Sequence, residues 1–302
     1  MDYKRINTIV GWMVFIFATT VYFMTLEPTT SLWDCGEYIT TAYKLEVGHP
    51  PGAPLFMMLG RLFSMFSGPE GAAMMVNGMS ALSSSFTILF LFWTITMLAK
   101  KTILNPGLSL FASAGAKPER KTVLTMGQQW AVIGSGLVGA IAYTFTESFW
   151  FSAVEGEVYA MSSFFTAIVV WAIFKWDSEL EDQENNPEDE ELQSKNADRW
   201  IVFIFFMIGL SIGVHLLNLL CIPAIAYVIY FRKYKETTAL GFILTGVIGI
   251  AALGIIQSVF IPKTVEIAGW FERFFVNSLG MGFNTGTIFF FMLMLGIIVG
   301  VL

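Results

Sequence analysis

Long apolar runs alternate with short polar segments along the chain. Several of these runs approach or exceed the roughly 20 residues that a helix needs to cross a bilayer. Backbone groups in lipid must bond internally, so we expect the runs to be helices, and the strand alternation of a β-barrel is absent. The predicted spans lie near 8–26, 76–99, 128–146, 158–176, 200–215, 217–231, 238–261 and 285–302. The pattern predicts an all-α polytopic membrane protein.

The composition agrees with this class. Hydrophobic residues make up 55% of the 302 residues and charged residues only 13%, against about 25% charged residues in soluble domains. No basic tract is interleaved with aromatic residues, so we expect the bilayer and no nucleic acid as a partner. Of the two cysteines, Cys221 lies in an apolar run, which argues against a disulfide framework.

Basic residues predict the orientation of the chain, because they concentrate in cytoplasmic loops. Lys4 and Arg5 place the N-terminus in the cytoplasm, and the first apolar run has no cleavage site, so it is retained. Two further groups mark inner loops: Lys100, Lys101, Lys117, Arg120 and Lys121 in the loop 100–127, and Arg232, Lys233 and Lys235 in a later one.

Residues 53–67 decide which side the first loops occupy. If this segment crossed the membrane, the basic loop 100–127 would face outside. The segment is short and carries Arg61, so we predict a surface helix within an outer loop at 27–75. Thirteen of the seventeen Lys and Arg residues then lie inside or at the inner boundary.

Two other segments carry organisational predictions. Residues 177–199 hold ten acidic residues and are predicted to be a solvated, disordered cytoplasmic loop. The chain ends within the apolar run 288–302, so we expect it to be the N-terminal part of a longer protein. No internal repeat supports an inverted-repeat transporter.

Candidate chemistry begins in the first outer loop. Asp34 and Glu37 are three residues apart, so a helix would place both carboxylates on one face. A carboxylate in a partly desolvated pocket can accept a proton from a hydroxyl. The alternative is that Asp34 caps a helix and Glu37 is solvated. His49 opens the rigid sequence His-Pro-Pro-Gly-Ala-Pro, which would hold it near the membrane or serve only as a stiff connector.

The second outer loop, 147–157, contributes more carboxylates. Glu155 and Glu157 lie between apolar runs with no basic residue nearby, and unpaired carboxylates at a membrane boundary are functional candidates. Simple exposure to water is the alternative. Tyr159 follows them and is a candidate binding residue, with a place in the interfacial aromatic belt as the alternative.

Three further residues are candidate binding groups. His215 and Asn218 lie where the fifth and sixth spans meet, and a helix–helix hydrogen bond is an equally good explanation for them. Arg61, like Arg273, is an outer cation that could meet a phosphate or could simply snorkel. No zinc signature appears, but the outer carboxylates could hold a divalent cation.

The order of these motifs resembles a known family. The sequence Asp34-Cys35-Gly36-Glu37, then His-Pro-Pro-Gly from His49, and Glu155-Gly156-Glu157 after a span is similar to bacterial membrane proteins of unknown function related to protein O-mannosyltransferases. These belong with the GT-C glycosyltransferases. Gly213-Val214-His215 is similar to the Gly-x-His of the family. The family pattern has Gly and Ser where this chain has Trp33 and Cys35.

The resemblance implies a mechanism and a location. A polyprenyl-phosphate sugar, with mannose as a candidate, would be the donor, and a Ser or Thr of an exported protein, a glycan or a lipid would be the acceptor. Asp34 would be the general base of an inverting displacement. His49, Arg61, Arg273 or a metal would offset charge on the leaving phosphate, while Glu37 and Glu155 or Glu157 would position acceptor or sugar hydroxyls. The enzyme would lie in a bacterial inner membrane, with its site on the periplasmic face.

Two other functions are compatible with the sequence. A transporter or flippase for a lipid-linked or polar solute would need charged residues deep within its spans, and these spans hold almost none. A non-catalytic subunit of an envelope complex would leave the outer carboxylates solvated, and an Asp34→Asn change would then leave its function intact.

Overall fold

A computed structural model describes residues 2–50, 52–105, 123–189, 197–234 and 236–301, which contain helices and no strand. The chain divides into two units, residues 1–221 and 222–302. The helices of the first unit are α1 (Tyr3–Met24), α2 (Cys35–Lys44), α3 (Pro54–Ser64), η1 (Pro69–Gly71), α4 (Ala72–Leu104), α5 (Met126–Thr144), α6 (Glu147–Val154), α7 (Val158–Asn185), α9 (Arg199–Ile212) and η3 (Leu216–Leu220).

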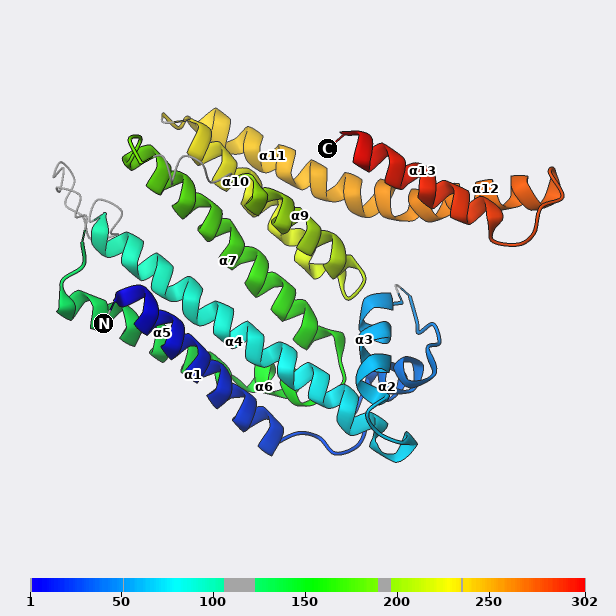
Figure 1. Cartoon of the computed structure of the whole chain (residues 1–302), viewed down its shortest axis with the longest axis horizontal. Coiled ribbons are helices and arrows are strands. Elements are labelled where there is room, and N and C mark those ends of the chain that lie inside the picture. The colour runs from blue at the N-terminus through cyan, green and yellow to red at the C-terminus, as the bar shows by residue number, and fades with distance from the viewer. Residues whose placement is uncertain (1, 51, 106–122, 190–196, 235, 302) are drawn as a thin grey trace. The chain divides into compact units, whose positions relative to one another are not determined.

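The first unit is built around α4. This helix packs against α1, α5 and α7, and α9 lies on the other side of α7 (Figure 1). The core between α1, α4 and α5 is aromatic and aliphatic, with Tyr22, Ile88 and Phe92 fully buried. The Tyr22 hydroxyl donates to the Thr144 carbonyl at 3.1 Å, which satisfies its polar end inside this core.

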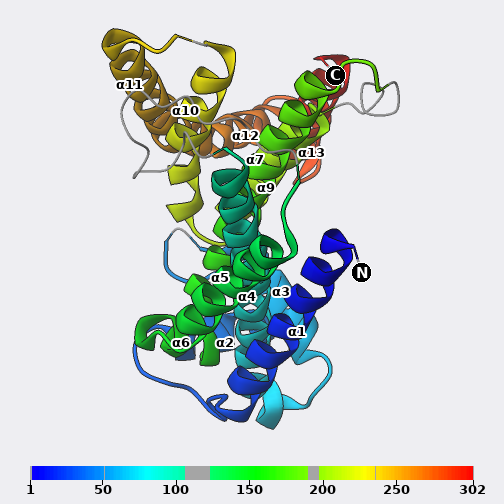
Figure 2. The same cartoon turned by 90° about the vertical axis from the view of Figure 1, so that its left-hand side faces the viewer.

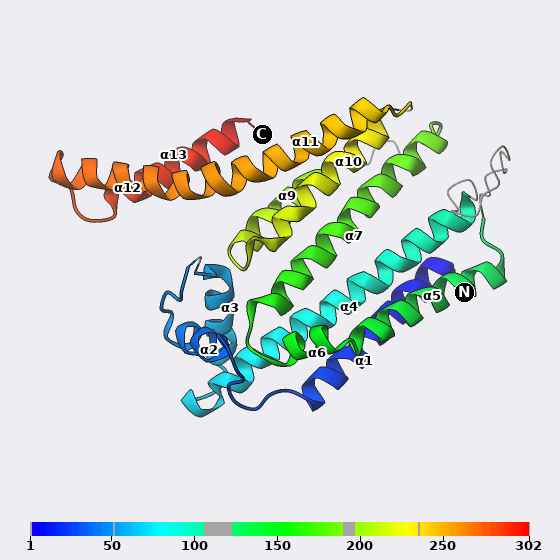
Figure 3. The ribbon, with the colours of Figure 1, turned by 180° about the vertical axis from the view of Figure 1, so that it is seen from behind.

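The short helices α2, α3 and α6 gather at one end of this bundle, beside the starts of α4 and α7 (Figures 2 and 3). Pro54 begins α3, as expected for a residue with a fixed φ and no N–H. The Gly213 carbonyl accepts hydrogen bonds from Leu55 N at 2.7 Å and Phe56 N at 3.3 Å, so the loop after α9 caps α3. At 11 residues, α3 is too short to cross a bilayer.

The second unit consists of helices that follow one another closely. They are the body of α10 (Cys221–Lys233), then α11 (Ala239–Ile255), η4 (Ile256–Phe260), α12 (Ile261–Asn277) and α13 (Thr285–Val301). A π-helical turn at η4 joins α11 to α12 directly before Pro262, which has no N–H to donate. Glu272 of α12 accepts a hydrogen bond from Thr287 N at 2.9 Å and ties α12 to α13.

The predicted fold class is confirmed, since every predicted span coincides with helix. Among the described residues, five helical segments are long and apolar enough to cross a membrane: Tyr3–Met24, Pro69–Leu104, Val158–Asn185, Leu216–Lys233 and Ala239–Asn277. The other three predicted spans correspond to α5, α9 and α13, so eight crossings stay a prediction. Residues 106–122 and 235, which carry part of the basic pattern, lie outside the described residues.

Two predicted loops are wrong in part. The acidic segment 177–199 is helical as far as Asn185, because Lys101 of α4 pairs with Asp177 and Glu181, which lie one turn apart on α7. Residues 190–196 of that segment lie outside the described residues. Residues 262–284, which join the last two predicted spans, are likewise mostly helix, since α12 continues to Asn277.

Candidate functional site

Asp34 stands at the start of α2. Its backbone carbonyl accepts from Tyr38 N at 2.9 Å and so begins the helix. Its side chain is exposed and makes no capping hydrogen bond, although aspartate commonly caps in this position. The capping explanation for Asp34 therefore fails, and its carboxylate is available to a ligand.

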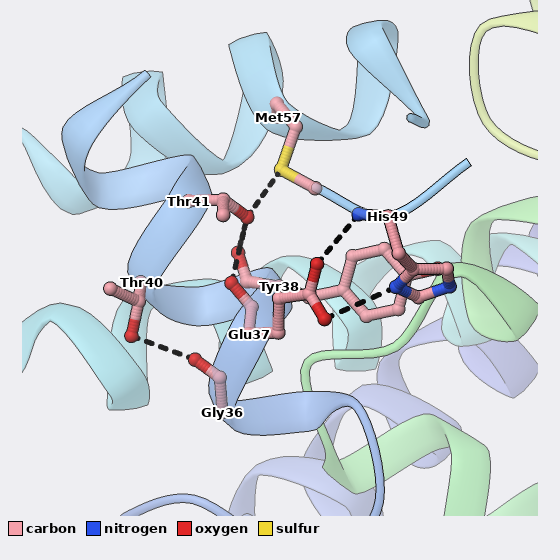
Figure 4. A network of polar contacts seen from close by, with 7 residues as sticks. All are labelled: Gly36, Glu37, Tyr38, Thr40, Thr41, His49 and Met57. Atoms are coloured by element: carbon pink, nitrogen blue, oxygen red, sulfur yellow. Dashed lines mark hydrogen bonds and ion pairs between the residues drawn. The ribbon is translucent and has the colours of Figure 1, made fainter. Parts of the chain in front are cut away.

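Glu37 lies one turn into α2 and is paired with His49. Its carboxylate accepts from His49 N at 2.6 Å and contacts His49 Nδ1 at 3.2 Å (Figure 4). These bonds from the backbone and ring of His49 hold the pKa of Glu37 below its ordinary value. Gly48 allows this approach, since a Cβ there would lie 3.1 Å from Glu37 Oε1. Pro51, in the same connector, lies outside the described residues.

Asp34, Glu37 and His49 form one cluster at the surface. Their carboxylate oxygens and imidazole nitrogen lie within 4.8 Å of one another. This donor set suits a divalent cation of the magnesium or manganese type. A cation bound through His49 Nδ1 would replace the contact of this atom with Glu37 Oε2.

Glu155 and Glu157 lie in the link between α6 and α7, and both are buried, each with 6% of its surface exposed. Ser31 donates a hydrogen bond to Glu155. Burial raises the pKa of Glu155, and the charge of Glu27 adds to the effect. Burial raises the pKa of Glu157 to about 7, with further contributions from the charges of Glu155 and Asp34. The alternative prediction, that both carboxylates are simply exposed to water, is therefore wrong.

Tyr38 connects the two groups of carboxylates. Its ring lies 5.6 Å from that of His49, centroid to centroid. Burial is the main reason that its pKa is raised to about 12, and the nearby negative charges of Glu157 and Asp34 raise it further. The structure thus brings together the two loops that the sequence predicts to lie outside, with Tyr38 close to the carboxylates of both.

His215 reaches the same region through Tyr159. The two rings lie 5.5 Å apart. His215 Nδ1 accepts from Leu217 N at 3.1 Å, and burial lowers the pKa of His215. The imidazole is consequently neutral with its proton on Nε2, which leaves one N–H for a ligand.

Two predicted binding residues make structural contacts within the protein, and their binding roles stay predictions. Arg61 Nη1 donates to the Tyr43 carbonyl at 2.7 Å and its guanidinium lies over the Tyr43 ring. Tyr43 is nine residues along α2 from Asp34, or about 13 Å at the helical rise, so Arg61 serves the far end of α2. Asn218 is fully buried, donating to Ser211 Oγ at 3.0 Å and accepting from Cys221 Sγ at 3.2 Å.

Sequence reasoning missed residues that support the site. Asn77, fully buried in α4, donates to the carbonyls of Glu27 at 2.7 Å and Thr29 at 2.9 Å. It thereby fixes the loop that carries Ser31. The sequence did offer a signal for Asn77: it is a polar residue inside a predicted apolar span, and such a residue needs hydrogen-bond partners in lipid. Ser31 has no comparable signal in the sequence.

The chain matches the profile of a known family over residues 34–238, described as the protein O-mannosyl-transferase TMEM260 N-terminal domain. Protein O-mannosyl-transferase tmem260 of Dictyostelium discoideum is 27% identical over 213 residues, which are 70% of this chain and 22% of that protein. Protein O-mannosyl-transferase TMEM260 of Mus musculus is 23% identical over 251 residues, or 82% of this chain and 29% of that protein. The chain thus spans less than a third of either relative. No solved structure gives a significant match.

Proposed function

Because this chain belongs to the protein O-mannosyl-transferase TMEM260 N-terminal domain family, we propose that it carries the catalytic carboxylates of a membrane glycosyltransferase. The enzyme moves a sugar, with mannose as the first candidate, from a polyprenyl-phosphate donor to a Ser or Thr hydroxyl of an exported protein. The reaction takes place on the outer face of the membrane. The observation that carries the proposal is the uncapped Asp34 carboxylate beside the Glu37–His49 pair and the buried Glu157.

Asp34 acts as the general base. As the acceptor oxygen attacks the anomeric carbon, Asp34 takes the hydroxyl proton, and the bond from the sugar to the phosphate oxygen breaks. The polyprenyl phosphate leaves with the bonding electrons. A direct displacement of this kind inverts the anomeric carbon, and phosphate is a leaving group that needs no strong acid.

The surrounding groups reduce the electrostatic cost of placing a phosphate beside carboxylates. Glu157, with a pKa of about 7, is partly protonated at neutral pH, which removes negative charge and supplies an O–H for a sugar hydroxyl. His215 offers its Nε2–H to the phosphate or the sugar. Glu37 is held by His49 and supports the position of that ring.

The test is a transfer assay on the full-length protein in nanodiscs, with polyprenyl-phosphate mannose and a Ser/Thr-rich peptide. Asparagine has nearly the shape of aspartate but cannot take the proton, so Asp34→Asn should lower kcat by about 10²–10⁴. Glu70→Gln, at an exposed acidic residue of η1, is the matched control and should leave kcat unchanged. Equal transfer by the wild type and Asp34→Asn would exclude Asp34 as the base.

The same protein preparation also distinguishes a glycosyltransferase from a transporter or flippase. In liposomes with a fluorescent polyprenyl-phosphate sugar, a flippase would move the lipid across the bilayer without any acceptor peptide. The glycosyltransferase should consume the donor only when the peptide is present. Lipid movement without sugar transfer would overturn the proposed function.

A further inference from the structure

Trp33, the residue directly before Asp34, combines a strained backbone with an exposed side chain. Its φ angle is 62°, in the left-handed region that glycine adopts freely and a bulky residue adopts at a cost. Its side chain is 88% exposed, so packing within the protein does not offset the cost. Strain of this kind that folding does not explain concentrates at ligand-binding positions.

The position of Trp33 limits what its ring can contact. Consecutive Cα atoms lie about 3.8 Å apart, so a polypeptide whose hydroxyl meets the Asp34 carboxylate must pass close to position 33. Glu155 and Glu157 mark the buried side of the site and Trp33 its exposed side. Leu32, which is 75% exposed, adds a second apolar side chain beside it.

We propose that Trp33 is a specificity-determining residue that packs on the acceptor polypeptide, next to the Ser or Thr whose hydroxyl Asp34 deprotonates. The inference rests on the proposed function. Trp33 is next to the exposed, charged Asp34, on the side from which a water-borne polypeptide would approach, whereas the sugar of a lipid-bound donor would be held by the buried carboxylates. Tryptophan is among the residues that contribute most at protein–protein contacts, because one rigid ring buries a large area.

The experiment compares Trp33→Gly and Trp33→Phe with wild type in the nanodisc assay. Trp33→Gly should raise the KM for the peptide about tenfold, the effect of losing a strong contact residue, and leave the donor KM within about twofold. Its melting temperature should stay equal or rise, because glycine accepts the φ of position 33. Trp33→Phe should retain most of the peptide affinity. The matched control is Trp130→Phe, at a tryptophan of α5 that is 58% exposed.

Three other results would contradict the role of Trp33 in acceptor binding. An unchanged peptide KM, a change in donor KM alone, or a lower melting temperature with both KM values altered would each overturn it. If the wild type transfers no sugar, the proposed function fails, and direct binding of the peptide still decides the role of Trp33. Equal peptide Kd values for wild type and Trp33→Gly would overturn the contact in that case.

Discussion

A Cβ atom at position 156 would lie 2.9 Å from the side-chain oxygen of Asn77, 3.0 Å from Ile39 Cγ1 and 3.1 Å from Val76 Cγ1. Gly156 therefore lets the link between α6 and α7 approach α2 and α4 closely. Because Glu155 and Glu157 flank this glycine, the contact also fixes the depth of both carboxylates. The same asparagine holds the Glu27–Thr29 loop, so Asn77 lies against both this loop and the link between α6 and α7.

Gly156→Ala should destabilise the protein by about 1–3 kcal/mol, the usual cost of overpacking a tight contact. It should also lower transfer activity, because Glu155 and Glu157 must move outward. Thermal unfolding in detergent and the transfer assay check the two effects. The control is Gly134→Ala in α5, where a Cβ would meet nothing within 4 Å and alanine favours the helix. Equal melting of both variants would contradict the close contact.

Glu157 should make stability depend on pH. Its pKa is about 7 in the folded protein and about 4.3 in an unfolded chain, so the folded state binds the proton more tightly. The stability from this group is fully present below pH 4.3 and is lost as the pH rises through 7. The Glu157→Gln side chain stays neutral, so this variant should lose about 1–3 kcal/mol less folding stability than the wild type as the pH rises. Melting curves between pH 4.5 and 8 measure it, and parallel curves for the two proteins would refute it.

Arg61 should contribute to stability more than to donor binding. Arg61→Gln removes the bond to the Tyr43 carbonyl and the contact with the Tyr43 ring, which should cost about 1–2 kcal/mol. The donor KM should stay within about twofold, since the guanidinium lies at the far end of α2. A tenfold rise in donor KM with unchanged melting would instead restore Arg61 as a phosphate contact.

The sidedness of the membrane assignment can be tested with single cysteines. Both native cysteines are buried, so background labelling should be low. Cysteines introduced at the exposed positions Glu46 and Glu188 should behave oppositely: an impermeant maleimide added to intact cells should label position 46 and leave position 188 unlabelled. Labelling of position 188 alone would invert the predicted topology.

Much of the fold could be predicted from the sequence because its dominant signal is one-dimensional. Apolar runs of membrane length become helices, and the predicted spans follow α1, α4 and α7 closely. The end of α7 could not be predicted in this way. Its acidic residues indicate solvation when considered alone, and they become helical through Lys101, which lies 76 residues earlier in the chain.

The candidate site shows the same division. Motif spacing identified Asp34, Glu37 and His49, which the fold gathers into one cluster. Spacing could not distinguish His215, whose ring meets Tyr159, from Asn218, whose partners are Ser211 and Cys221. Both lie in the same short segment, and only the turn between α9 and η3 decides which side chain faces inward.

The length of α7 between two charged positions matches the thickness of a bilayer. Glu157 precedes the first residue of this helix, and Asp177, held by Lys101, lies twenty residues further on. At about 1.5 Å per residue this interval measures about 30 Å, the thickness of the hydrocarbon layer of a bilayer. If α7 crosses the bilayer with Asp177 at one boundary of the hydrocarbon layer, its length would place Glu157 at the opposite boundary, next to the lipid phosphates.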